Sequence, residues 1–166
     1  LIKKGYNPKG IGLFLWSYTK LFAATGDDTY RTKIDEFIEI LDGLRNSNYG
    51  GHGWGYNFNW QSRAFYVPKG TPTIVNSSFV GHALLDAFER AGNQRALEMA
   101  IPIGDFIQKG LNRTSDGNTV CLSYTPIDHL IVHNANLLGA SLLARLNRYQ
   151  PDDSKLELAH QALNYS

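Results

Sequence analysis

Residues 9–44 read KGIGLFLWSYTKLFAATGDDTYRTKIDEFIEILDGL, a stretch with two helical patterns on either side of one short turn. Apolar side chains recur at three- and four-residue spacing through residues 9–24, which predicts a helix with one buried face. The tripeptide Thr25-Gly26-Asp27 then provides a stop and a new N-cap. A second helix is predicted for residues 28–44, with its acidic side chains turned to solvent. The stretch therefore predicts an antiparallel helical hairpin.

The hairpin pattern recurs twice along the chain, with a period of about 60 residues. The predicted pairs are residues 74–90 with 94–111, and residues 133–148 with a last helix that follows Pro151. Thr73 is expected to cap the third helix, and Pro102 predicts a kink in the fourth. Two long connections, residues 46–72 and 112–132, separate the pairs and are expected to be irregular.

The three pairs predict an all-α fold of about six helices. The first helix of each pair is rich in small residues, which suits an inner ring where neighbours approach closely, and the more charged second helices suit an outer ring. We interpret residues 1–166 as a single domain of antiparallel hairpins that form part of an (α/α)6 toroid. A stacked-hairpin solenoid is the alternative, because helical periodicity alone does not separate the two.

Composition and charge argue against several classes of partner and location. A formal net charge of +1 and a pI near 8.0 give no basic face, which argues against nucleic acid as the main partner. No apolar segment approaches the ~20 residues of a membrane span, and no basic-then-apolar leader is visible, so we expect a cytoplasmic protein. The single Cys121 excludes an internal disulfide framework. Because residue 1 is Leu1, we expect a processed chain or a piece of a longer one.

In a ring of hairpins, all long connections lie on one rim, so the two connections should share a ligand site. Residues 49–63 combine glycines, aromatic rings and amides without any acidic residue. The expected role of the aromatic side chains is to stack on a sugar. The alternative is that the tryptophans are packing residues that fill the centre of the ring of helices. The predicted substrate-binding residues are His52, Trp54, Tyr56, Asn59, Trp60, Gln61, Arg63, His133, Asn134 and Asn136.

The catalytic candidates are Asp128, Tyr124 and His129 in the second connection. Glycoside hydrolysis usually needs two carboxylates, and Asp128 is the better of the few available, although a cap or turn role is the alternative. Proton abstraction, as in a lyase or an epimerase, would instead use a histidine or tyrosine base with Arg63 as the cation. A metal site built from His52, His129 and His133 is a weaker alternative, and we expect neither a catalytic metal nor a cofactor.

Four motifs carry a family resemblance: GWGYNFNWQSRAF at residues 53–65, PKGTPT at 68–73, SYTPID at 123–128 and VHNANLLGA at 132–140. The chain resembles the six-hairpin glycosidase-like superfamily, and most closely the bacterial polysaccharide-biosynthesis proteins of the Vps J type. The resemblance implies a ring of twelve helices with a carbohydrate-binding funnel where the inner helices begin. This chain would then be half of a toroid, with two open edges covered by a second copy in a homodimer or by a missing segment.

The sequence predicts a carbohydrate-active protein that binds or processes a saccharide, whether neutral or acidic, in polysaccharide metabolism or biosynthesis. If it is an enzyme, a glycoside hydrolase, a lyase and an epimerase remain open as reaction types. The alternative is a non-catalytic helical-repeat module that presents a groove to a peptide or protein, which the shortage of carboxylates favours.

Overall fold

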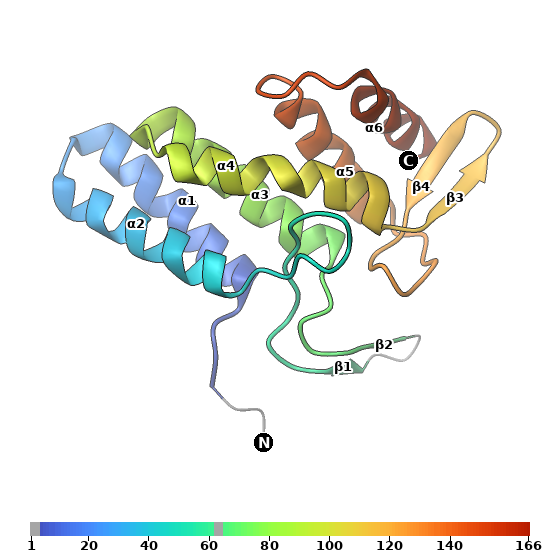
Figure 1. The fold of residues 1–166 in the computed structure, drawn as a ribbon, viewed down its shortest axis with the longest axis horizontal. Coiled ribbons are helices and arrows are strands. Elements are labelled where there is room, and N and C mark those ends of the chain that lie inside the picture. The colour runs from blue at the N-terminus through green and yellow to red at the C-terminus, as the bar shows by residue number, and fades with distance from the viewer. Residues whose placement is uncertain (1–3, 62–64) are drawn as a thin grey trace.

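The computed structural model describes residues 4–61 and 65–166, which fold into six α-helices and two small β-hairpins (Figure 1). The helices are α1 (Pro8–Thr25), α2 (Asp28–Gly43), α3 (Ile74–Ala91), α4 (Gln94–Asp105), α5 (His133–Leu146) and α6 (Asp153–Tyr165). The strands are β1 (Trp60–Gln61) with β2 (Tyr66–Val67), and β3 (Arg113–Asp116) with β4 (Thr119–Leu122), both pairs antiparallel. The prediction of about six helices in antiparallel pairs is confirmed.

The short turns have the chemistry that the sequence predicts. Gly26 and Gly92 end α1 and α3 with φ angles of 69° and 68°, a left-handed conformation that glycine adopts without the steric cost of a Cβ. Asp27 then caps α2, and Asn93 caps α4 through its side chain. Thr73 caps α3, as expected, by accepting a hydrogen bond from the Asn76 N–H.

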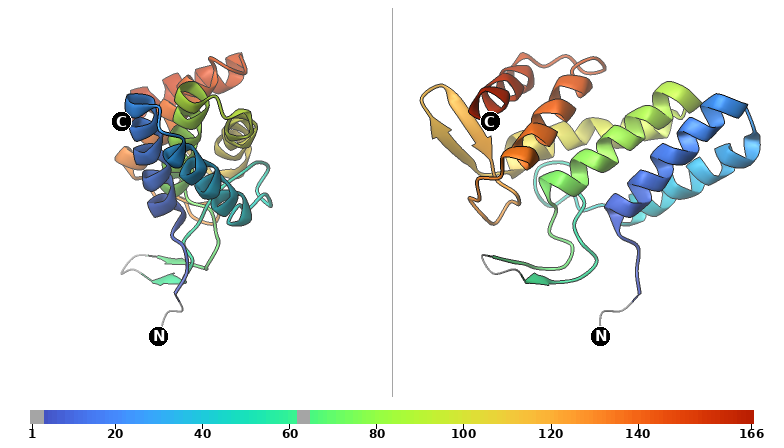
Figure 2. Two further views of the ribbon diagram at one scale, coloured as in Figure 1. Left: turned by 90° about the vertical axis from the view of Figure 1, so that its left-hand side faces the viewer. Right: turned by 180° about the vertical axis from the view of Figure 1, so that it is seen from behind.

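The helices form two layers. Helices α1, α3 and α5 lie next to one another in chain order, and α2, α4 and α6 each pack against the preceding helix. The view from behind shows α1 and α3 in front of their partners (Figure 2). Small residues allow the close approach of the first layer. A Cβ on Gly12 of α1 would lie 3.4 Å from Val80 of α3, and one on Gly81 of α3 would lie 2.6 Å from Leu142 of α5.

The fourth helix differs from the expected kinked helix. At Asp105, α4 changes into the π-helix η1 (Phe106–Gly110). Pro102 has no N–H to donate within the helix, and the first long connection packs here instead. The His52 N–H donates to the Pro102 carbonyl at 3.0 Å, and a Cβ on Gly51 would lie 2.2 Å from the same oxygen.

The two long connections are not wholly irregular, because the first contains the β1–β2 pair and the second contains the β3–β4 hairpin, which turns at Gly117. Strand β3 is polar and largely exposed, whereas β4 buries Val120, Cys121 and Leu122 against the helices. An exposed polar strand has no apolar alternation, so the sequence pattern did not reveal it. Within the described residues, the structure contains no helix that is long and apolar enough to cross a membrane.

Candidate functional site

An aromatic wall joins the two long connections at the start of α3. It consists of Tyr56, Phe58, Trp60, Phe65 and Tyr124, all half-buried. Tyr56 stacks on Phe58 with ring centroids 5.4 Å apart, and Trp60 meets Tyr56, Phe65 and Tyr124 edge-on at 5.2, 4.7 and 5.8 Å. Burial raises the pKa of the Tyr124 hydroxyl, with a further contribution from the neighbouring Tyr56. Tyr56, Trp60 and Tyr124, which were predicted as site residues, are therefore brought together.

Trp54 is not part of this wall. Its side chain has no exposed surface, and its indole N–H donates to the Leu41 carbonyl at 2.7 Å. Its backbone N–H donates to the Ser77 hydroxyl at 3.0 Å. The prediction that Trp54 stacks on a sugar is corrected, because a buried ring has no face to offer a ligand. The residue instead attaches the first connection to α2 and α3, much as the alternative of a ring plug supposed.

Asp128 has its carboxylate occupied by its own loop. Oδ1 accepts from the N–H groups of Tyr124 at 3.2 Å and Leu130 at 3.0 Å. Oδ2 accepts from the Thr125 N–H at 2.9 Å and from its hydroxyl at 2.5 Å. Four donors hold the conformation of the second connection, which is the turn role considered above for this residue. Tyr124, Asp128 and His129 share this connection, and His129 is exposed on it.

Two of the candidates on α5 have structural partners. Asn136 is fully buried: its Oδ1 accepts from the Leu122 N–H at 3.0 Å, and its Nδ2 donates to the Ala162 carbonyl at 2.8 Å. The amide links β4 to α6, so its prediction as a ligand-binding residue is corrected. His133 stacks on Tyr165, with centroids 6.0 Å apart, and therefore faces the end of α6. Asn134 is exposed.

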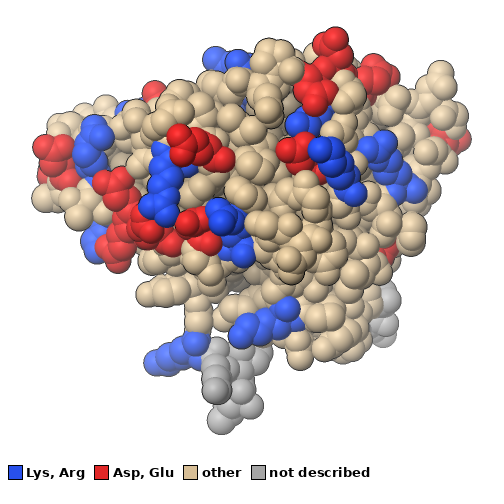
Figure 3. Space-filling view, viewed as in Figure 1, with Lys and Arg blue, Asp and Glu red and all other residues tan. Residues whose placement is uncertain are grey.

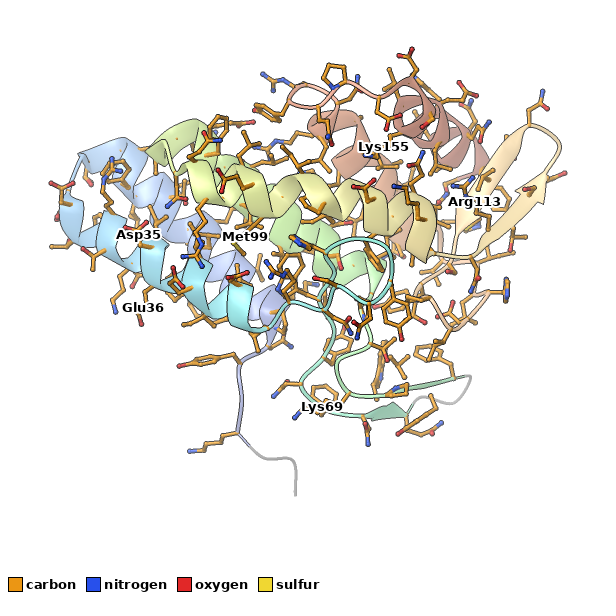
Figure 4. All side chains as sticks on the ribbon, viewed as in Figure 1. Asp35, Glu36, Lys69, Met99, Arg113 and Lys155 are labelled. Carbon is orange, nitrogen blue, oxygen red and sulfur yellow. The ribbon has the colours of Figure 1, made fainter. Side chains whose placement is uncertain are left out.

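The remaining candidates lie at different places on the first connection. His52 packs against α4, with Nδ1 3.2 Å from the carbonyl oxygen of Met99, and burial lowers its pKa. Figure 4 shows Met99 on α4, apart from Lys69 on the connection that carries the wall. Asn59 Oδ1 accepts from the Lys69 N–H at 2.8 Å, and Gln61 Nε2 donates to the Phe65 carbonyl at 3.3 Å. Arg63 lies outside the described residues.

The structure also reveals a polar strip on α3 that the sequence analysis missed. Phe79, His82, Asp86 and Glu89 recur at three- and four-residue spacing, so they lie on one face of the helix. This face borders α1 on one side, where the Trp16 indole N–H donates to Asp86 Oδ2 at 2.6 Å. We call these four residues the inner strip.

Arg145 connects α5 to the inner strip. Its Nη2 donates to Asp86 Oδ1 at 2.5 Å and to Glu89 Oε2 at 2.8 Å. Its Nη1 lies 3.3 Å from His82 Nδ1 and donates to the His82 carbonyl at 3.2 Å. The Tyr149 hydroxyl donates to Glu89 in addition. Burial opposes ionisation of Glu89, but the hydrogen bonds from Tyr149 and Arg145 still hold its pKa below the usual value.

His82 is held neutral in one tautomer. Burial lowers its pKa first, and the guanidinium of Arg145 lowers it further. Because a guanidinium only donates, Nδ1 must accept, and the ring proton resides on Nε2. His82 therefore offers an N–H donor at the half-buried surface of the inner strip. Within residues 4–61 and 65–166, no three His, Cys, Asp or Glu side chains are placed to hold a metal ion.

The signal for the inner strip was present in the sequence. Apart from Asn76 and Arg90, the other residues of 74–91 are small or apolar, so the polar side chains at 82, 86 and 89 recur on one face of a mostly buried helix. Sequence reasoning attributed function to the long connections instead, because loops commonly carry binding residues. The partner Arg145 lies 59 positions from Asp86, and no pattern within one helix reveals such a pair.

No protein-family model matches the sequence, and no curated protein matches it, but solved structures share its fold. A D-mannose isomerase aligns with a TM-score of 0.69 at 18% identity, over 95% of this chain and 42% of the isomerase. A family 76 glycoside hydrolase from a bovine Bacteroides thetaiotaomicron strain aligns with a TM-score of 0.72 at 14% identity, over 99% of this chain and 35% of the hydrolase. An endo-β-1,4-glucanase from Acetobacter xylinum aligns with a TM-score of 0.66 at 13% identity, over 99% of this chain and 51% of the glucanase.

The chain has the fold of part of an α/α toroid. It spans about half or less of the length of the toroid structures to which it is similar. The predicted all-α class and the resemblance to six-hairpin glycosidase-like proteins are confirmed at the level of the fold. We refer to α1, α3 and α5 as the inner helices, after the ring expected from the sequence, and the inner strip lies on α3 between α1 and α5.

Proposed function

We propose that the chain binds a saccharide along the aromatic wall and the inner strip, as the ligand-binding half of an α/α toroid. The observation that carries the proposal is that the aromatic wall is attached to the helix that carries the inner strip. The Tyr124 carbonyl accepts from the Ile74 N–H at 3.0 Å, so the wall stands directly on the first turn of α3. Half-buried rings suit the apolar face of a sugar, and the polar strip beyond them suits its hydroxyl groups.

The charges of this region favour binding or proton transfer over two-carboxylate hydrolysis. Asp86 and Glu89 share the guanidinium of Arg145, and Asp128 is held by four donors within its loop. Two-carboxylate hydrolysis requires an acid and a base on opposite sides of the bond. His82 Nε2–H is placed to donate to a sugar hydroxyl, and the Tyr124 hydroxyl is kept protonated as a second donor by its raised pKa.

The biological setting that we propose is bacterial polysaccharide metabolism. Its support is the resemblance of the motifs at residues 53–65, 68–73, 123–128 and 132–140 to polysaccharide-biosynthesis proteins of the Vps J type. Solved toroids of similar fold include a D-mannose isomerase, an endo-β-1,4-glucanase and an α-mannanase, which is compatible with a sugar ligand. We propose residues 1–166 as one domain that needs no cofactor for binding.

Titration of the 166-residue chain with manno- and cello-oligosaccharides, followed by calorimetry and tryptophan fluorescence, tests the proposal. Trp60→Ala should weaken binding by about tenfold, because stacking on an aromatic ring contributes about 1 kcal/mol or more. Tyr30→Ala is the matched control and should bind normally, because it removes a ring of α2 that packs against Tyr18 of α1. No binding of any oligosaccharide by the folded chain would refute the proposal.

A second candidate role, self-association through the two open edges, is favoured by complementary apolar surfaces. Helix α1 exposes Leu13, Phe14 and Leu21 at 42%, 57% and 42%. Between α5 and α6 lies an apolar groove of about 170 Å³, lined by Leu137, Ala140, Ser141, Ala144, Leu156, Ala159, His160 and Leu163. In this second role the exposed apolar side chains of α1 pack into the groove of a second copy of this chain, which would close the ring.

Light scattering coupled to size-exclusion chromatography tests the second role. The chain should elute as a dimer, and Ala144→Arg should convert it to a monomer by filling the groove with a charge. Thr32→Arg on the exposed surface of α2 is the control. A monomeric wild-type chain at high concentration would eliminate this role and leave saccharide binding untouched.

A further inference from the structure

Charge is distributed unevenly between the two layers of helices. The inner helices carry Lys9, Lys20, Arg90 and Arg145 against Asp86 and Glu89, a formal excess of two positive charges. Helix α2 of the outer layer carries five acidic residues against two basic ones. Figure 3, which shows the face with α2 and α4 toward the viewer, has acidic and basic side chains intermixed over these helices. The positive excess therefore belongs to the inner layer.

Two lysines account for this excess. The Lys9 ammonium lies 4.2 Å from the ring centroid of Phe79, and the Lys20 ammonium lies 4.5 Å from that of Trp16. Such cation–π contacts orient a lysine without neutralising it. In the parts of the chain that the structure describes, neither lysine forms an ion pair. Both are thus held over aromatic rings with their charges uncompensated.

The two rings belong to the inner strip or touch it, because Phe79 is a member and Trp16 donates to Asp86. Lys9 and Lys20 are eleven residues apart on α1, which corresponds to about 16 Å along the helix axis. They therefore mark two positions along the border of the strip. The acidic groups of the strip are already bound by Arg145, Arg90, Trp16 and Tyr149, so they are poor partners for a ligand's cations.

We propose that the saccharide bound along the inner strip is acidic, with carboxylate groups that pair with Lys9 and Lys20. The inference rests on the proposed saccharide-binding function and names its ligand class. Two lysines without acidic partners attract an acidic ligand and raise its local concentration. The aromatic wall binds the sugar face, and the two lysines select a uronate over a neutral sugar.

Calorimetric titration with a short oligogalacturonate and with a neutral manno-oligosaccharide of equal length tests the inference. At low salt the acidic ligand should bind at least tenfold more tightly than the neutral one. The advantage should disappear near 1 M salt, where screening acts over about 3 Å. The double variant Lys9→Gln/Lys20→Gln should lose the preference while it still binds the neutral ligand.

The matched control is Lys33→Gln/Lys109→Gln. It removes two charges from the outer layer, where the Lys33 and Lys109 side chains are 48% and 62% exposed. This control should keep the preference, and an equal loss in both double variants would overturn the assignment to Lys9 and Lys20. Equal affinity for the two ligands would overturn the acidic class and leave saccharide binding standing. Failure of the folded chain to bind either ligand would overturn both proposals.

Discussion

The guanidinium of Arg145 on α5 donates to the carboxylate of Asp86 on α3 at 2.5 Å. The other oxygen of the same carboxylate accepts from the indole N–H of Trp16 on α1 at 2.6 Å. One side chain, only 5% exposed as a residue, therefore contacts all three inner helices. This arrangement makes the inner strip a rigid surface, since its central charge is fixed from both sides.

Arg145→Met should destabilise the fold by about 1–3 kcal/mol, because it removes the closer of the two cations that bind the buried carboxylate of Asp86 and leaves only the more exposed Arg90, at 3.3 Å. Urea denaturation followed by circular dichroism measures the loss. Lys33→Met is the control, since Lys33 pairs with Glu36 on the exposed surface of α2 and should cost less than about 1 kcal/mol.

The double variant Asp86→Asn/Arg145→Met distinguishes an uncompensated charge from lost packing. It should be more stable than Arg145→Met alone, because the neutral amide needs no cation and can still accept from Trp16. A double variant that is less stable than Arg145→Met would contradict this account.

Trp54 and Trp60 should respond in opposite ways to replacement by alanine. Trp54→Ala should cost about 3–5 kcal/mol of stability, because it empties a fully buried site and removes the indole donor of the Leu41 carbonyl. Trp60→Ala removes a half-buried ring and should mainly weaken saccharide binding. Thermal unfolding and calorimetry on both variants check the contrast; loss of folding in Trp60→Ala would instead give the whole connection a structural role.

The helices were predictable because their information is local. Apolar spacing and caps at Asp27, Thr73 and Asn93 lie within a few residues of the elements that they define. The site was less predictable because burial is set by distant packing. Trp54 and Trp60 lie six residues apart in the same connection, yet only Trp54 is covered by α2 and α3. The inner strip depends on Arg145, which only the fold brings to α3.

Asp128→Asn should destabilise the chain by about 1–3 kcal/mol, because in either orientation the NH2 group of the asparagine would face hydrogen-bond donors. Oδ2 now accepts from both the N–H and the hydroxyl of Thr125, and an NH2 group cannot accept there. Chemical denaturation provides the measurement, with Asp116→Asn on the exposed β3 strand as control. Unchanged stability together with loss of a catalytic activity would restore Asp128 as a catalytic residue.

The stability of the chain should fall as the pH is lowered from neutrality, and His82 should be one cause. Its pKa in the folded state lies below the ordinary value of 6.5, because burial and Arg145 disfavour the charged ring. Below pH 6.5 the unfolded chain therefore binds a proton that the folded chain resists. The stabilisation is complete above that pH and is lost progressively toward the lowered folded pKa.

His82→Gln should flatten this part of the stability profile without removing it, because burial also lowers the pKa of His52. Urea titrations at several pH values between about 5 and 8, the range in which histidine responds, provide the comparison. If His82→Gln has the same pH slope as the original chain, the ring is already accessible to protons, and its assignment as a fixed neutral donor fails.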